Sequence, residues 1–161
     1  FPLPEAQLDR FLMKMQLGYP SMTDELKMLE MLQHEHPLDK ISPVVSAEEL
    51  VACQNAVRHV HVAPQVRQYL LEIIHATRDC EDLGLGASPR GSIALFRTCQ
   101  ALAAMRGRDY VQPDDIKFIV SPVLAHRVIL TPDARLRKIT AEYVIDEIVA
   151  EIAVPTMVQN S

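Results

Sequence analysis

The sequence predicts a mainly α-helical domain from Pro20 onward, preceded by a single strand. Two observations support this prediction. After Pro20, apolar residues recur at helical spacing in segments that begin at capping residues or prolines and are joined by short connections. Residues 11–17 instead alternate with the two-residue period of a strand, from Phe11 to Leu17. No internal repeat or low-complexity tract occurs.

The first three expected helices have clear start signals. Ser21, followed by acidic residues, opens a helix that Pro37 ends. Residues 46–49 (Ser-Ala-Glu-Glu) form a capping box that opens the second helix, and Pro64 opens the third. Apolar residues share one side of each helix, which predicts that these sides are buried in a core.

The stretch GASPRG at residues 86–91 predicts a fourth helix that carries an arginine in its first turn. Ser88 is a good N-cap, Pro89 suits the first helical position, and Gly107 is a plausible stop. Backbone N–H groups and the helix dipole favour anions at this end, so Arg90 is locally unfavourable there unless it shares a bound phosphate. The alternative is that Arg90 points into solvent.

Two more helical segments are expected towards the C-terminus. Pro113, with two aspartates after it, starts a helix that runs towards His126, and Pro122 is expected to kink or divide it. Thr131 caps a final segment that extends to Ile152.

Composition and charge narrow the function. A hydrophobic content of 48% and a charged content of 23% are ordinary for a globular protein. A net charge of −5 argues against nucleic-acid binding, and no apolar run is long enough for insertion into a membrane. Three widely spaced cysteines, Cys53, Cys80 and Cys99, form no metal-binding pattern and are typical of reduced thiols in a cytoplasmic protein.

The start of the sequence is unusual. It begins at Phe1, without an initiator methionine, and close to a patterned segment. A lone strand over residues 11–17 needs partners, and the extended stretch at residues 59–62 is a weak candidate. We therefore expect a C-terminal piece of a longer protein that keeps one strand of a sheet at its edge.

Several short motifs follow one another along nearly the whole chain. They are LPEAQLDRFL (3–12), LGYP (17–20), GASPRG (86–91), ALAA (101–104), RGRDYV (106–111) and PDDI (113–116). Together they resemble the end of the ATPase core and the helical lid of MoxR-type AAA+ proteins. The resemblance implies that residues 1–19 are a remnant of the α/β ATPase core, with its last strand and arginine-finger segment. Residues 20–161 would then form an α-helical lid-type bundle.

The resemblance also implies a role for Arg10 in Asp9-Arg10-Phe11. This residue stands at the position of the arginine finger, which reaches in trans to the γ-phosphate held by the neighbouring subunit. Such an arginine can raise the rate by about 10³- to 10⁵-fold by neutralising charge in the transition state. The residue pattern alone leaves another interpretation open, in which Arg10 pairs with Glu5 or Asp9 at a helix end, and Asp9 could also hold the finger in place.

Arg90 resembles the sensor-2 arginine of the lid, which contacts the nucleotide of its own subunit in cis. Ser88, Pro89 and Gly91 surround it and are expected to belong to the same nucleotide site. Because such an arginine belongs to the lid while other phosphate contacts belong to the core, the resemblance implies a lid that rotates about residues 18–20 during hydrolysis.

The full-length protein implied by the resemblance binds ATP and Mg²⁺ and assembles into a homo-oligomeric ring, with a hexamer as the family's form. It acts in chaperone-like remodelling or maturation of client proteins, together with proteins that carry a von Willebrand factor type A domain. This chain has no Gly-rich phosphate loop and no acidic strand end to hold the metal. We therefore expect it neither to hydrolyse ATP nor to bind nucleotide tightly when alone.

Two other function classes stay open. One is a non-enzymatic helical interaction domain whose apolar helix faces bind a partner. The other is a helical nucleic-acid-binding module, which would need a strongly basic helix that the sequence lacks.

Four histidines, His34, His36, His59 and His61, raise the question of a metal site. His34 and His36 are two residues apart in an expected helix and so point to different sides. His59 and His61 would share a face of an extended segment, as metal ligands can. Surface or partly packed histidines are the alternative, and the role of these four stays open.

Overall fold

The computed structural model describes residues 3–34 and 36–156. These residues divide into two compact units. Unit 1 contains the described residues up to Lys14 together with those from Ala56 onward, and unit 2 contains residues 15–55.

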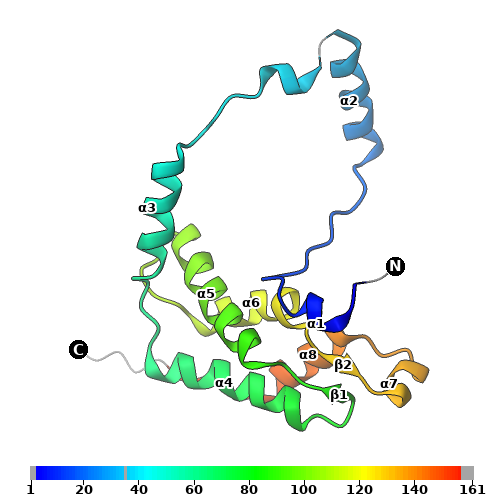
Figure 1. Cartoon of the computed structure of the whole chain (residues 1–161), viewed down its shortest axis with the longest axis vertical. Coiled ribbons are helices and arrows are strands. Elements are labelled where there is room, and N and C mark those ends of the chain that lie inside the picture. Colours follow the sequence, from blue (N-terminus) through cyan, green and yellow to red (C-terminus); the bar gives the residue numbers. More distant parts are fainter. Residues whose placement is uncertain (1–2, 35, 157–161) are drawn as a thin grey trace. The chain divides into compact units, whose positions relative to one another are not determined.

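Unit 1 is a helical bundle with a small antiparallel sheet beside α7 (Figure 1). Its elements are α1 (Glu5–Leu8), α4 (Pro64–Asp79), β1 (Leu83–Leu85), α5 (Pro89–Met105), α6 (Pro113–Leu124), β2 (Ile129–Leu130), α7 (Pro132–Leu136) and α8 (Ala141–Glu151). Helices α4, α5, α6 and α8 pack on one another around a core that includes Tyr69, Ile73, Leu95, Ile116 and Ile145. The mainly helical fold expected from the sequence is therefore confirmed.

The start signals in the sequence act as helix caps. The Ser88 hydroxyl accepts a hydrogen bond from the Arg90 amide at 3.2 Å, and the Thr131 hydroxyl accepts one from the Ala134 amide at 3.3 Å. The stop signal also holds, since Gly107 follows α5 with a left-handed φ of 72°.

Helix α6 differs from its expected extent at the C-terminal end. Pro122 lies inside the helix without dividing it, and the helix ends at Leu124 before reaching His126. A proline in the last turn removes only one backbone hydrogen bond, so the helix continues past it.

The final segment after Thr131 contains two helices, α7 and α8. Between them Lys138 adopts a left-handed φ of 59°, which ends the first helix. Thr140 then caps the second by accepting a hydrogen bond from the Tyr143 amide at 3.1 Å. The second cap explains why the segment is divided.

The prediction of a remnant strand over residues 11–17 is wrong, because these residues form no strand in the structure. The Lys14 amide instead donates to the carbonyl of Pro122 in α6 at 2.8 Å. A strand forms only where a second strand completes its ladder, and the described part of the chain supplies none beside this segment.

The sequence does not predict strands β1 and β2. Leu83 pairs with Leu130 and Leu85 with Ile129. The extended stretch at residues 59–62 contributes only an isolated parallel bridge from His61 to Tyr110. Two- and three-residue strands are too short to show a period in the sequence.

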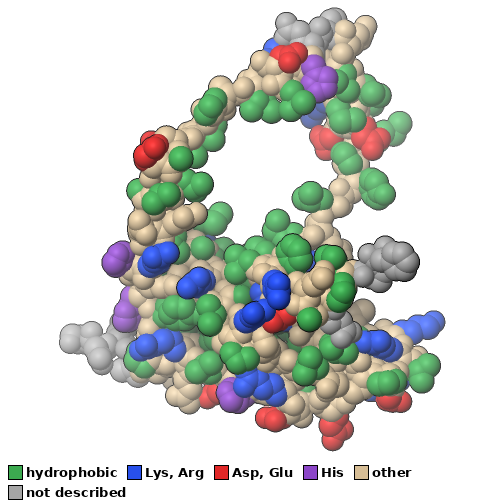
Figure 2. Space-filling model, in the orientation of Figure 1, with side chains coloured by type: hydrophobic (Ala, Val, Ile, Leu, Met, Phe, Trp, Pro, Cys, Tyr) green, Lys and Arg blue, Asp and Glu red, His purple; other side chains and the backbone are tan. Residues whose placement is uncertain are grey.

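Unit 2 contains α2 (Met22–His34), a 3₁₀-helix (Pro37–Lys40) and most of α3 (Ala47–Val57). The predicted capping box is present, since the Ser46 amide donates to Glu49 Oε2 at 2.7 Å and the Glu49 amide to the Ser46 hydroxyl at 3.1 Å. The apolar side of α2 is not buried as expected, and hydrophobic side chains are visible on the surface over this unit (Figure 2). Met22, Leu26 and Leu29 are 79%, 53% and 60% exposed. Every described side chain of this unit is exposed, so the unit has no core of its own.

The cysteines are all free, and they differ in exposure. Cys53 is exposed, Cys80 is half-buried and Cys99 is buried in α5. Burial, with a smaller contribution from the charge of Asp115, raises the pKa of the Cys99 thiol to about 12. This cysteine therefore stays a neutral thiol.

None of the described helices combines the length and the apolar character that a membrane crossing requires.

The end of α4 and the segment before α5 approach each other so closely at Gly86 that a side chain does not fit. A Cβ atom added there would lie 2.4 Å from the Thr77 carbonyl oxygen and 2.6 Å from the Arg78 Cα atom. We expect Gly86→Ala to lower the free energy of unfolding by about 1–3 kcal/mol, because backbone has to move. Gly84→Ala is the matched control, since its nearest atoms are 3.8 Å away. Chemical denaturation of both variants tests this, and equal midpoints would contradict it.

Candidate functional site

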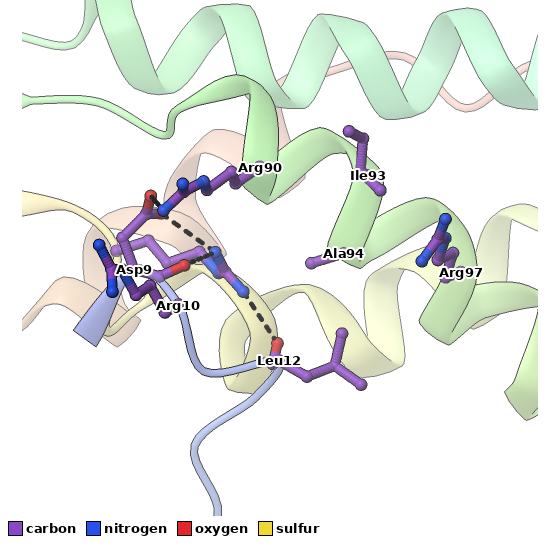
Figure 3. Close-up of a pocket in the computed structure, with 8 residues that line it drawn as sticks. Asp9, Arg10, Leu12, Arg90, Ile93, Ala94 and Arg97 are labelled. Carbon is purple, nitrogen blue, oxygen red and sulfur yellow. Dashed lines mark hydrogen bonds and ion pairs between the residues drawn. The ribbon is translucent and has the colours of Figure 1, made fainter. Parts of the chain in front are cut away.

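An open pocket of about 290 Å³ lies in unit 1 between the N-terminal segment and α5 (Figure 3). The side chains that line it come from three places in the sequence. They are Asp9, Arg10 and Leu12 of the N-terminal segment, Arg90, Ile93, Ala94 and Arg97 of α5, and Arg127 after α6.

The first turn of α5 presents Arg90 to this pocket. Its amide is held by the Ser88 cap, and its side chain points towards Asp9 (Figure 3). The Arg90 Nη1 atom lies 3.9 Å from Asp9 Oδ2, and the Arg90 side chain is 61% exposed. Arg90 therefore lies near a carboxylate and is also accessible to a ligand.

Asp9 connects the N-terminal segment to unit 1's helices. Its carboxylate accepts hydrogen bonds from the Ser88 hydroxyl at 3.1 and 3.2 Å and from Arg127 Nη1 at 3.0 Å. Because the Arg127 side chain is only 2% exposed, its ion pair with Asp9 is shielded from water on one side. Asp9 is thus fixed by the start of α5 and by the segment after α6.

Arg10 is exposed and has no ion pair or side-chain hydrogen bond to any described residue. The proposed pairing with Asp9 does not form, because Asp9 is engaged by Arg127, Ser88 and Arg90. The side chain of Glu5, the other proposed partner, lies outside the described residues. Within the described part of the chain, the Arg10 guanidinium is available to a ligand.

The other predicted site residues lie around α5 in different ways. Ser88 and Pro89 line a second pocket, of about 810 Å³, which Lys14 and Arg78 also line. Gly91 is buried and lines neither pocket. A Cβ atom on Gly91 would lie 3.2 Å from Leu124 Cδ2, so glycine allows close packing there. Roles of Ser88, Pro89 and Gly91 in nucleotide binding stay predictions.

The charge around the first pocket is predominantly positive. Among the described residues, three arginines line it besides Arg127, namely Arg10, Arg90 and Arg97, and Asp9 is the one carboxylate. The Asp9 charge is already matched by the buried Arg127. The remaining guanidinium groups favour a ligand with negative charge, and their planar forks suit phosphate or carboxylate oxygens.

Sequence reasoning does not single out Arg127 as a functional residue. The available signal is its place between two apolar runs, residues 123–125 and 128–130, because an arginine among buried residues is almost always paired. Its partners in the N-terminal segment lie more than a hundred residues away in the sequence, as the separation of 118 from Asp9 shows. Sequence periodicity cannot reveal such a contact.

The histidines do not form a metal site in the described structure. The described residues contain no group of three or more histidine, cysteine or acidic side chains that could hold a metal ion. His61 is exposed and joins the backbone of residues 109–111, and the side chain of His34 lies outside the described part.

Comparison with known proteins identifies the domain. The AAA lid domain family matches residues 75–152. The chain is 43% identical to the uncharacterized protein YeaC of Bacillus subtilis over 96% of its own length and 48% of that protein. It is 36% identical to Chaperone MoxR1 of Mycobacterium tuberculosis, over 96% of its own length and 43% of that protein.

The fold also matches a solved structure. A crystal structure of a candidate ATPase from Cytophaga hutchinsonii superposes with a TM-score of 0.90 at 30% identity, covering 97% of this chain and 50% of that one. The chain thus spans about half the length of the relatives it matches. The lid-domain match, the relatives and the shared fold agree with the motifs: this chain belongs to the MoxR family of AAA+ ATPases and contains its AAA lid domain.

Proposed function

We propose that the pocket between Asp9 and α5 binds the phosphate groups of ATP in a full-length protein that joins this chain to an ATPase core. The observation that carries this proposal is the placement of Arg10 and Arg90 in the lining of one pocket. Both arginines are exposed, and the carboxylate beside them is held by a buried arginine. A polyphosphate is the ligand that would neutralise this arrangement.

The proposed chemistry divides between two groups. Arg10 would neutralise negative charge that develops on the γ-phosphate during transfer to water, as an arginine finger does. Arg90 would bind phosphate in the ground state and in the transition state, next to the N-terminus of α5. Mg²⁺ would require ligands from the ATPase core, because Asp9 is engaged and is the one carboxylate among the described residues that line the pocket.

The geometry favours one nucleotide for both arginines. The family resemblance assigns Arg10 to the nucleotide of the neighbouring subunit and Arg90 to that of its own subunit. Both side chains line the same pocket of one compact unit, and Asp9, which precedes Arg10, lies 3.9 Å from Arg90. We therefore propose that the two arginines of one subunit act on the same nucleotide, held by the core of a neighbour.

This assignment requires an oligomer. AAA+ ATPases assemble into rings, and we propose a homo-oligomeric, hexameric ring for the full-length protein. One relative carries the name of a chaperone, which supports chaperone-like remodelling or maturation of client proteins as the cellular role. Partners with a von Willebrand factor type A domain belong to the same proposal.

Arg90→Ala in the full-length protein tests the binding role. We expect the dissociation constant of this variant for ATP to rise about tenfold or more, because a charge-assisted hydrogen bond contributes about 1.5–3 kcal/mol to the binding free energy. Isothermal titration with a non-hydrolysable ATP analogue measures this. The control is Arg67→Ala on an exposed part of α4, outside this pocket. Equal affinities of both variants would remove Arg90 from the site.

The exposed apolar side chains of unit 2 favour a second candidate, a non-enzymatic interaction domain. If that function is correct, addition of nucleotide should leave the thermal midpoint of the full-length protein unchanged. A nucleotide-dependent shift in the thermal midpoint of the full-length protein would argue for the first candidate.

A further inference from the structure

Arg127 is a charged residue buried at the contact between the N-terminal segment and the helical bundle. It follows α6, and its side chain is 2% exposed. A buried guanidinium is stable only where its N–H groups have partners, because an unpaired charge carries a large desolvation cost. Its hydrogen bonds therefore indicate what it is placed to hold.

The Arg127 guanidinium has five N–H groups and reaches five acceptors. One is the carbonyl of Val123 in α6, bound by Nε at 2.9 Å, which fixes the direction of the side chain. The other four lie in the N-terminal segment: the carbonyl and the carboxylate of Asp9, the carbonyl of Phe11, and the carbonyl of Leu12 at 3.2 Å.

These acceptors surround Arg10 in the sequence. The carbonyls of Asp9 and Phe11 belong to the residues immediately before and after it. His126 adds a contact to the same segment, with Nε2 3.0 Å from the Phe11 carbonyl oxygen. The backbone on both sides of Arg10 is therefore fixed to the bundle that carries Arg90.

We infer that Arg127 is the positioning residue for Arg10, which it holds at the pocket shared with Arg90. This inference rests on the proposed function, in which Arg10 acts on the transferred phosphate. Arg127 itself lines the edge of the pocket with its donors already used, so it acts through the segment it binds. The contact makes the placement of the finger depend on the lid domain.

The role requires arginine rather than lysine. An ammonium group has three donors on a flexible stem, whereas the planar guanidinium presents its donors in a fixed fork. Lysine at this position keeps the charge and loses most of the hydrogen bonds to residues 9–12.

Arg127→Lys in the full-length protein tests the inference. We expect kcat for ATP hydrolysis to fall by about 10- to 100-fold, because a small displacement of a catalytic group has effects of this size. KM for ATP should change by less than about threefold, since phosphate binding by Arg90 is retained. The control is Arg67→Lys, which makes the same change on the exposed side of α4.

A double-mutant cycle separates positioning from general stability. If Arg127 acts through Arg10, then Arg127→Lys should lower kcat little further once Arg10 is alanine. Asp9→Asn provides a second variant that should disturb folding less, because Asp9 is 21% exposed. We expect it to lower kcat about tenfold on its own and to lower kcat little further once Arg10 is alanine.

The outcomes of the cycle are distinct. If the losses in kcat of the single variants multiply in the double variants, the positioning role is overturned while the proposed function stays intact. A normal kcat of the Arg127→Lys protein has the same consequence. A normal kcat in Arg10→Ala alone would instead contradict the finger role on which this inference rests.

Discussion

Arg10→Ala in the full-length protein is expected to lower kcat for ATP hydrolysis by about 10³-fold or more, the effect of losing an arginine finger. ATP affinity should change little, because Arg90 still contacts the phosphates and Arg10 is assigned to charge that develops only in the transition state. In the described structure the Arg10 side chain makes no hydrogen bond or ion pair with another residue, so the thermal midpoint should also be unchanged. Steady-state kinetics, titration with a non-hydrolysable analogue and thermal unfolding give the three measurements.

A mixture of Arg10→Ala and Arg90→Ala subunits, assayed at an ATP concentration well below the dissociation constant of the Arg90→Ala variant so that both parent variants are impaired, tests whether the two arginines share one nucleotide. If both act on the nucleotide of the neighbour, each contact in a mixed ring lacks one of the two arginines, and mixing restores no activity. If Arg10 acts in trans and Arg90 in cis, an Arg90→Ala subunit can supply Arg10 to an Arg10→Ala neighbour. Mixing then restores part of the activity.

We expect no restoration, because both side chains line one pocket of one unit. Recovery of activity in the mixture would contradict the shared nucleotide while supporting both arginines as part of the site. Mixtures of each variant with wild-type subunits serve as controls for subunit exchange, since activity should fall in them as the mutant fraction rises.

The parts of the fold that could be predicted from the sequence are those set by local chemistry. Ser46, Ser88 and Thr131 cap helices as expected, because a capping hydroxyl binds an amide within three residues. The strands could not be predicted, since Leu83 pairs with Leu130 across a long separation and the strands are very short. The expected strand at residues 11–17 failed for a related reason: alternation indicates a strand only where a neighbouring strand is available.

The site shows the same division between local and distant information. Arg90 can be chosen as a candidate site residue from the sequence, because it is a cation expected at a helix N-terminus. A short motif makes Arg10 a candidate as well. The sequence offers Asp9 as a residue that could hold the finger, and the structure places Asp9 between Ser88, Arg90 and Arg127. Its bond to Arg127 joins distant residues and depends on how α6 packs, so only the fold reveals it.

Asp115 is expected to be the ionisable residue whose loss most destabilises unit 1. It lies in the first turn of α6 with no exposed surface, and its carboxylate accepts hydrogen bonds from Arg106 at 2.9 Å and from Arg108 at 2.6 and 2.8 Å. The amide of Gln112 adds a further bond at 2.8 Å. These contacts join the end of α5 to the start of α6.

Asp115→Ala should lower the free energy of unfolding by about 3 kcal/mol, the lower end of the range for breaking a buried pair, because Arg106 remains 41% exposed and can turn to water. Asp114→Ala is the matched control, since Asp114 is the exposed neighbour in the same turn and should cost less than about 1 kcal/mol. Urea denaturation gives both values. Equal midpoints for the two variants would show that the hydrogen bonds of Asp115 with Arg106, Arg108 and Gln112 contribute nothing beyond a surface charge.

The hydrogen bonds of Asp115 also predict how the stability of the protein depends on pH. Burial by itself raises the pKa of Asp115, but the hydrogen bonds from Arg108 and from the Gln112 amide, with the charges of both arginines, outweigh it and lower the pKa. A carboxyl whose pKa is lower in the folded state stabilises the fold above its unfolded pKa, about 3.9, and this contribution is lost as pH falls through the folded value. Below about pH 4 the wild-type protein should therefore lose stability more steeply than Asp115→Asn, which has no proton to gain there. Urea midpoints measured from pH 6 down to pH 3 test this, and parallel curves for the two proteins would contradict it.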